Sequence, residues 1–235
     1  MADSSSVSIL VNIFTSPSAA FTALKERPNP WVALLIVLGL SAAVSFLYLQ
    51  VVDLPWMLDR QLSQGASLTD AQRDQMVEGA LQISPTVYGV IGIVSTTLWL
   101  LMVLAVVGLY FTAVSFATND GVKFGQWFAM GAWALMPMVF GLAATFVNLL
   151  VSDARFLAPE QLNPLSFANL LGIEIEGASA SQIALLSRDI TALWCVLLFV
   201  LGYQVFAQRS LVRAATVVLA PLVVIVGIVV ILVAL

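Results

Sequence analysis

The longest stretch without a charged residue runs from Gly79 to Asn119 and covers 41 residues. A segment inside a bilayer has to satisfy its backbone hydrogen bonds internally, as a helix, and about 20 apolar residues are enough to cross. Hydrophobic residues make up 61 % of the chain and charged residues only 9 %, whereas a soluble domain has roughly 45–50 % and about 25 %. The sequence therefore excludes a soluble globular fold and predicts an all-α polytopic membrane helical bundle.

Four further uncharged runs are long enough to cross, so that the predicted spans are about 31–52, 85–117, 127–151, 190–207 and 214–235. The long run would hold two spans only if a turn divided it, and its centre has no Pro, Asn or Asp to form one. Pro85 favours a helix start, and Asn119-Asp120-Gly121 favours a stop. We therefore predict one long helix there and five transmembrane helices, with six as the alternative.

Residues 1–30 are predicted to form a cytoplasmic interfacial segment that precedes the first span. Ser16-Pro17 is a helix start with Pro at the first position, and Phe21 and Leu24 share one face of the helix that follows. Asp3 stands where a signal peptide would carry basic residues, so we do not expect a cleaved signal.

Basic residues predict the orientation of the five spans. The N-terminal segment and the loops at 118–126 and 208–213 lie on one side, and they contain Lys25, Arg27, Lys123, Arg209 and Arg213. The opposite loops, roughly 53–84 and 152–189, hold four basic residues over a longer sequence. By the positive-inside rule the N-terminus is then cytoplasmic and the C-terminus outside. The Ala/Val/Leu-rich composition favours a bacterial cytoplasmic (inner) membrane.

The two long outer loops carry helix signals of their own. Thr69-x-x-Gln72 and Ser179-x-x-Gln182 are capping boxes, and Asn163-Pro164 predicts the start of a short helix that Gly172 ends. We expect short amphipathic helices that lie along the membrane surface.

Several chemistries have no residues to perform them. The chain has no His and one Cys, Cys195, which excludes a His general base, a His-ligated metal and a Cys cluster. Asp189 lies only at the edge of the fourth span, and the predicted hydrophobic cores hold no ionisable residue. The net charge of −4 argues against nucleic-acid binding. We expect no enzyme, metal or cofactor.

Polar residues inside the spans have two interpretations. One is helix–helix packing through hydroxyl and amide hydrogen bonds and close glycine contacts; the other is a polar pathway for a solute. Pro137 removes a backbone hydrogen bond within the third span and is expected to kink it. The polar residues in question include Thr96, Thr112, Asn148 and Gln204.

Three motifs resemble those of the Yip1-domain family of small multispan membrane proteins. They are Phe14-Thr-Ser-Pro17 with Phe21 and Leu24, Trp127 with Trp133-Ala-Leu-Met-Pro137, and Asp189-Ile-Thr-Ala-Leu-Trp194 with Gly202, Arg209 and Arg213. The resemblance implies a five-helix transmembrane Yip1-like domain over 31–235. Its pattern marks six positions as candidate packing sites: Pro17, Trp133, Pro137, Asp189, Trp194 and Gly202.

The resemblance also bears on partners and function. Eukaryotic members look like trafficking factors that associate with small GTPases, but only about 30 residues precede the first span here, which argues against a GTPase partner. The first hypothesis is a non-enzymatic membrane scaffold or adaptor that organises partner proteins, copies of itself or lipids. The alternative is a small transporter or channel for a neutral or lipidic solute.

Overall fold

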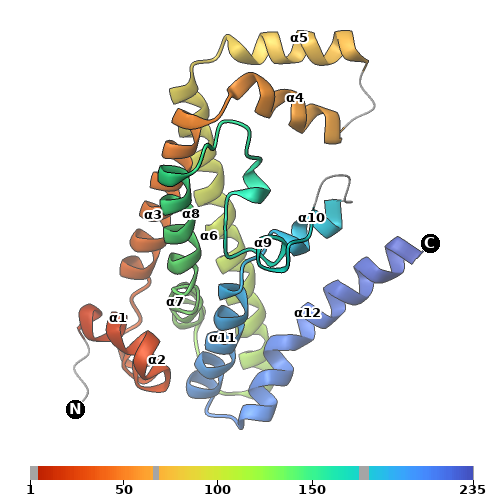
Figure 1. Cartoon of the computed structure of the whole chain (residues 1–235). Helices are drawn as coiled ribbons and strands as arrows, with labels where there is room; N and C mark the ends of the chain where they lie inside the picture. Colours follow the sequence, from red (N-terminus) through yellow and green to blue (C-terminus); the bar gives the residue numbers. More distant parts are fainter. Residues whose placement is uncertain (1–4, 66–68, 175–179, 235) are drawn as a thin grey trace. The chain divides into compact units, whose positions relative to one another are not determined.

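The fold was examined in a computed structural model, which describes residues 5–65, 69–174 and 180–234 (Figure 1). These residues form helices and no strand; Ser166 and Asp189 make one isolated antiparallel bridge. The predicted all-α class is therefore confirmed over the part of the chain that is described.

Most described residues lie in helices, although residues 152–166 form an irregular connection with one short 3-10 turn (Figure 1). In chain order they are α1 Ser6–Thr15, α2 Pro17–Glu26, α3 Trp31–Val51, α4 Leu54–Gly65, α5 Asp70–Leu81, α6 Pro85–Thr118, α7 Phe124–Ala134, α8 Met138–Val151, the 3-10 turn η1 Pro159–Gln161, α9 Phe167–Leu171, α10 Ala180–Leu186, α11 Thr191–Ala207 and α12 Leu211–Ala234.

The uncharged run between Glu78 and Asp120 forms a single helix, as predicted. Helix α6 has 34 residues and begins at Pro85. Beyond its end, Asn119 has φ 51° and Gly121 has φ 74°. Left-handed backbone of this kind cannot continue a helix, and Gly and Asn are the residues that adopt it most easily. The stop signal therefore acts through backbone conformation.

Two described helices, α3 and α6, are long and apolar enough to cross a membrane. Helices α7 and α8 pass the same test as a pair with a bend of 41° between them, which would make three spans. Thr191–Ala207 and Leu211–Val224 are apolar but shorter. The structure thus supports an integral membrane protein with two or three clear spans, which is fewer than the predicted five.

The bend between α7 and α8 lies at Pro137, where the sequence predicts a kink. Because Pro137 has no N–H, the carbonyl of Trp133 has no partner four residues on and accepts from Met136 N at 3.1 Å instead. Met138 N and Val139 N likewise bond to carbonyls three residues earlier. This run of tighter turns divides the predicted third span into two helices.

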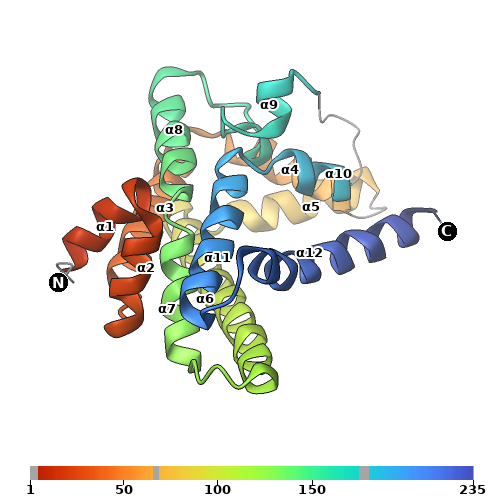
Figure 2. The same ribbon diagram turned by 90° about the horizontal axis from the view of Figure 1, so that it is seen from below.

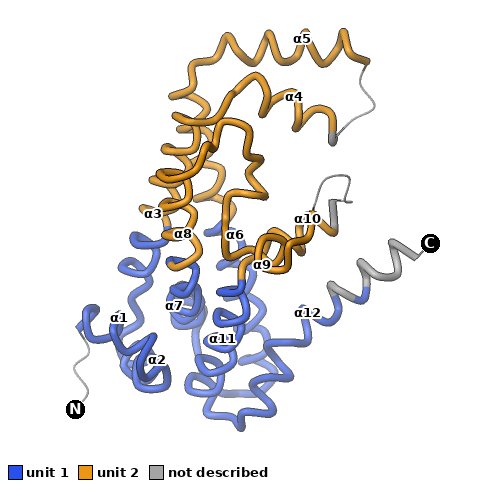
Figure 3. The backbone as a smooth tube through the Cα atoms, in the orientation of Figure 1, with its two compact units in different colours: residues 1–37, 100–139, 190–235 blue, residues 38–99, 140–189 orange. Residues whose placement is uncertain are grey.

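The chain divides into two compact units, which are described separately (Figure 3). Unit 1 comprises Met1–Val37, Leu100–Val139 and Ile190–Leu235, and unit 2 comprises Leu38–Trp99 and Phe140–Asp189. In unit 1, α11 packs against α2, α7 and α12, and Figure 2 shows α2, α7 and α11 side by side. The N-terminal helices are therefore part of a packed core.

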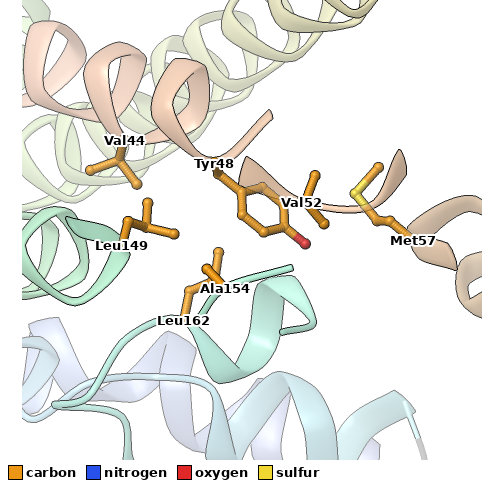
Figure 4. Packing of buried hydrophobic residues seen from close by; sticks show 7 residues of the cluster. All are labelled: Val44, Tyr48, Val52, Met57, Leu149, Ala154 and Leu162. Carbon is orange, nitrogen blue, oxygen red and sulfur yellow. The ribbon is translucent and has the colours of Figure 1, made fainter. Parts of the chain in front are cut away.

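The core of unit 2 joins the C-terminal part of α3 to α8 and to the loop that follows α8 (Figure 4). The Tyr48 hydroxyl donates a hydrogen bond of 2.9 Å to the carbonyl of Leu157 in that loop. The backbone N–H of Asp53 donates to the Arg155 carbonyl at 2.9 Å. The buried residues of this cluster are Val44, Tyr48, Val52, Met57, Leu149, Ala154 and Leu162.

The helix signals in the outer loops have different outcomes. The capping box of Thr69 and Gln72 is present at the start of α5. The short helix α9 ends at Gly172, as predicted, but it begins after Ser166, whose hydroxyl accepts from Asn169 N. The predicted start at Asn163 is wrong because its side chain accepts from Leu165 N and donates to Asp189. Ser179 lies outside the described residues.

Candidate functional site

The N-terminal helices dock onto α7 and α11 within unit 1, and we call this contact the docking core. Helix α2 begins at Pro17 as predicted, although the Ser16 side chain forms no capping hydrogen bond. Phe21 and Leu24 share the inner face of α2, and both are fully buried. A segment predicted to lie at an interface thus presents its apolar face to the bundle.

Gly202 makes close packing possible at the centre of the docking core. A Cβ atom on Gly202 would lie 2.7 Å from Met130 Sδ in α7 and 3.2 Å from Phe21 Cε1 in α2. Real Cβ atoms do not come this close to a neighbour, so only glycine lets α11 approach both helices without a shift. The pattern position Gly202 therefore has a steric role.

Buried aromatic rings fill the space around this contact. Trp127 of α7 stacks on Tyr203 of α11 with ring centroids 5.3 Å apart and an angle of 13°. Phe111 of α6 lies 5.2 Å from the Trp127 ring, and Phe206 lies 5.5 Å from it. The indole N–H of Trp127 donates to Ser115 Oγ at 2.8 Å, so its polar atom is satisfied.

Two more pattern positions hold the N-terminal helices in place. The indole N–H of Trp133 donates to the carbonyl of Asn29 at 2.8 Å, just before the chain enters α3. Trp194 of α11 meets Phe14 of α1 edge-to-face, with centroids 5.6 Å apart. Pro137 is buried in the same unit. Five of the six pattern positions thus belong to unit 1.

Basic residues close two helix ends in this unit. Lys25 Nζ donates to the Phe206 carbonyl at 2.7 Å, in the last turn of α11. Arg209 Nη2 donates to the Thr118 carbonyl at 3.0 Å, at the end of α6. The last carbonyls of a helix lack helical partners and carry partial negative charge, which a cation stabilises. The sequence indicated a membrane side for these residues but not this capping role.

Asp189, the sixth pattern position, lies in unit 2. Its Oδ2 accepts from Asn163 Nδ2 at 2.8 Å and faces Gly141 of α8 so closely that a Cβ atom there would overlap it. Ser166 and Asp189 form the isolated bridge, and Phe167 N donates to the Arg188 carbonyl at 2.8 Å. Asp189 therefore links the end of the loop at 152–189 to Gly141 of α8 and to Asn163.

Two of the four polar residues considered for a solute pathway, Thr112 and Asn148, form hydrogen bonds within the protein. Thr112 Oγ1 donates to the Gly108 carbonyl of its own helix at 2.6 Å. Asn148 Nδ2 donates to the Leu162 carbonyl at 2.9 Å, and its Oδ1 accepts from Ser152 Oγ at 2.7 Å. These contacts favour packing over a pathway. Over the described ranges, no group of three or more His, Cys, Asp or Glu could hold a metal ion.

Sequence reasoning missed a hydrogen bond that joins α6 to α12 in unit 1. Pro221 lies inside α12 and has no N–H to offer the Val217 carbonyl four residues earlier. The Tyr110 hydroxyl donates to that carbonyl at 2.8 Å. The unmet carbonyl could have been inferred from the position of Pro221, but its partner, 107 positions away, could not.

Of the comparisons with known proteins, only the one with family models found a match. Neither the search of curated proteins nor the search of solved structures found a match. The family model described as the Yip1 domain matches residues 11–234, which include all six pattern positions. The chain therefore belongs to the Yip1-domain family.

Proposed function

We propose that this protein is a non-enzymatic membrane scaffold or adaptor that organises partner proteins, copies of itself or lipids. In this proposal it crosses the bacterial cytoplasmic membrane five times, with a cytoplasmic N-terminal segment at 1–30 and the C-terminus outside. The bent α7–α8 pair forms the third span, and α11 and α12 form the last two. The Yip1-domain membership and the apolar helices support membrane insertion.

The charges of the two units support the proposed orientation. Unit 1 carries five basic residues and unit 2 carries four, and those of unit 1 lie in shorter segments close to the ends of the proposed spans. Cytoplasmic loops of membrane proteins are enriched in Lys and Arg. Unit 1 includes every basic residue assigned to the cytoplasmic side: Lys25, Arg27, Lys123, Arg209 and Arg213.

One observation supports the scaffold role most strongly: helix α6 is largely exposed along its apolar stretch, although Phe111 and Ser115 near its end are buried in unit 1. Only 6 % of its most apolar stretch is buried within the chain. Trp99 is 63 % exposed and Leu98 is 62 % exposed. The exposed surface of such a span is available to lipid or to the helices of other membrane proteins.

A small, polar patch in α6 distinguishes a partner helix from lipid alone. We define the α6 patch as Gly92, Ser95 and Thr96, which are three and four residues apart and so share one face. No atom lies within 4 Å of the Cβ position of Gly92, and Ser95 and Thr96 are both exposed. Small residues permit close helix approach, and hydroxyls form hydrogen bonds across helix pairs.

The hydroxyls of the α6 patch differ from others in the bundle. Thr112 and Thr145 each donate to the carbonyl four residues earlier in their own helix. The side-chain hydroxyls of Ser95 and Thr96 form no hydrogen bond with any described residue. Hydroxyls without partners are costly in hydrocarbon, which favours a second helix against this face.

Site-specific crosslinking tests the proposal. A photo-reactive amino acid is placed at Thr96, and a matched one at Val94, which is also exposed on α6 but lies on the opposite face of the helix from the patch. Irradiation of intact membranes should give the same protein adducts repeatedly from Thr96 and not from Val94. Either a partner protein or a second copy of the chain fits the scaffold role. Lipid adducts alone at both positions would contradict a protein partner at the α6 patch.

A further inference from the structure

A pocket lined by two arginines lies in unit 1. Its volume is about 330 Å³, and it opens between the end of α6, the end of α11 and the start of α12. We call it the arginine pocket. It is lined by Thr118, Tyr203, Arg209, Arg213, Thr216 and Val217.

The two arginines of the pocket differ in exposure and in hydrogen bonding. Arg209 is half-buried, and its bond to the Thr118 carbonyl fixes the position of the guanidinium. Arg213 is exposed, and its guanidinium makes no hydrogen bond or ion pair with any described residue. A guanidinium has five N–H donors and matches the oxygens of a phosphate in a bidentate manner. Most of these donors are therefore available.

The surrounding backbone and charges also favour an anion. Ser210 caps the start of α12 through Arg213 N at 3.4 Å. The positive end of the dipole of this long helix lies beside Arg209 in the preceding loop and Arg213 in the first turn. The nearby carboxylate of Asp120 accepts from Thr118 Oγ1 at 3.0 Å and from Val122 N at 3.2 Å. Both carboxylate oxygens are thus bound within the turn, and Asp120 forms no ion pair with either arginine among the described residues.

The rest of the pocket is apolar and belongs to a predicted span. Tyr203, Thr216 and Val217 form the rest of its wall, and α12 continues as an apolar helix beyond them. Contact with this apolar wall would not stabilise a bound phosphate ion, whereas the acyl chains of a lipid could pack along it. Basic pockets between transmembrane helices on the cytoplasmic side bind anionic headgroups.

We infer that the arginine pocket binds the phosphate headgroup of an anionic phospholipid, with Arg209 and Arg213 as its ligands. The inference deepens the proposed scaffold role, on which it rests, because it names one lipid class that the protein organises. It does not depend on the α6 patch or on any protein partner, and the two proposals can therefore fail separately.

Native mass spectrometry of the full chain in a mild non-ionic detergent tests the inference. Phosphatidylglycerol and phosphatidylcholine with the same acyl chains are added in turn, and inorganic phosphate is a third arm. The Arg213→Gln variant is compared with Arg27→Gln, which removes the same charge from an exposed residue of unit 1 outside the pocket. Unfolding temperatures without lipid show that each variant is folded; if Arg213→Gln is not, Arg213→Lys takes its place.

Phosphatidylglycerol should bind the unaltered chain more tightly than phosphatidylcholine, and Arg213→Gln should weaken it about fivefold, since one basic residue at a membrane surface contributes about 1 kcal/mol. Arg27→Gln should leave it unchanged. Arg213→Lys keeps the charge and should lose less than Arg213→Gln. Equal effects of Arg213→Gln and Arg27→Gln, equal binding of the two lipids, or inorganic phosphate that competes as well as the lipid would each overturn the inference.

Discussion

The Tyr110 hydroxyl of α6 donates a hydrogen bond of 2.8 Å to the carbonyl of Val217 in α12. Pro221 cannot supply the backbone N–H that this carbonyl would otherwise receive. A side chain of one apolar helix thus satisfies a backbone carbonyl of another that has no helical donor. In a bilayer no water is available to replace a lost partner, so this hydrogen bond stabilises the packing of α12 against α6.

A double-mutant cycle tests that relationship. Tyr110→Phe should lower the free energy of unfolding by about 1 kcal/mol, because the Val217 carbonyl is left without a partner. Pro221→Ala restores a helical donor, so Tyr110→Phe should cost much less in that background. The measurement is reversible unfolding in mixed micelles for all four variants. An equal cost in both backgrounds would show that Pro221 does not create the need for Tyr110.

Gly202→Ala should destabilise the docking core. The new methyl would meet Met130 Sδ, which is fully buried in α7, at 2.7 Å. Overpacking of this kind costs about 1–3 kcal/mol. Gly39→Ala in α3 is the matched control, because nothing lies within 4 Å of its Cβ position, and it should be neutral or stabilising by up to about 1 kcal/mol. Thermal unfolding that fell equally for both would count against a steric role for Gly202.

Gly141→Ala should displace the Asp189 side chain and break its hydrogen bond to Asn163. We expect a loss of about 2 kcal/mol, from steric overlap and from the lost charge-assisted hydrogen bond. Asp189→Ala removes the overlapping group, so the double variant should be more stable than the sum of the two single losses. Additive losses, measured by the unfolding midpoint, would mean that the two residues do not interact.

Trp133→Phe removes the indole N–H that donates to the Asn29 carbonyl and keeps most of the buried ring. The loss should be about 1 kcal/mol. Backbone hydrogen exchange in α2 should accelerate, because the connection from α2 to α3 loses an anchor. Leu98→Phe, at an exposed position of α6, serves as a control that should not affect α2. Unchanged exchange in α2 would contradict the anchoring role.

The parts of the fold that the sequence predicted depend on local signals. The start of α6 at Pro85, its stop at Asn119 to Gly121 and the break at Pro137 each follow from the backbone limits of the residue itself. The capping box at Thr69 is local in the same way. The start of α9 was predicted wrongly because Asn163 interacts with Asp189, 26 residues later.

The contacts that define the docking core could not be read from the sequence. Gly202 stands out only as a family position, and its close neighbours, Met130 and Phe21, come from two distant helices. Lys25 and Arg209 were assigned to a membrane side from their charge, but the helix ends that they cap depend on how α2, α6 and α11 pack. Tertiary packing, which periodicity does not encode, decides these roles.

Topology tests the central proposal, a five-span bundle with its ends on opposite sides of the membrane. Reporters fused at Gly121, Gly177 and Leu235 of the full membrane-inserted chain distinguish the cytoplasm from the outer face. We expect the reporter at Gly121 to lie in the cytoplasm and the reporters at Gly177 and Leu235 to lie at the outer face. A cytoplasmic reporter at Leu235 would contradict five spans and the orientation proposed from them.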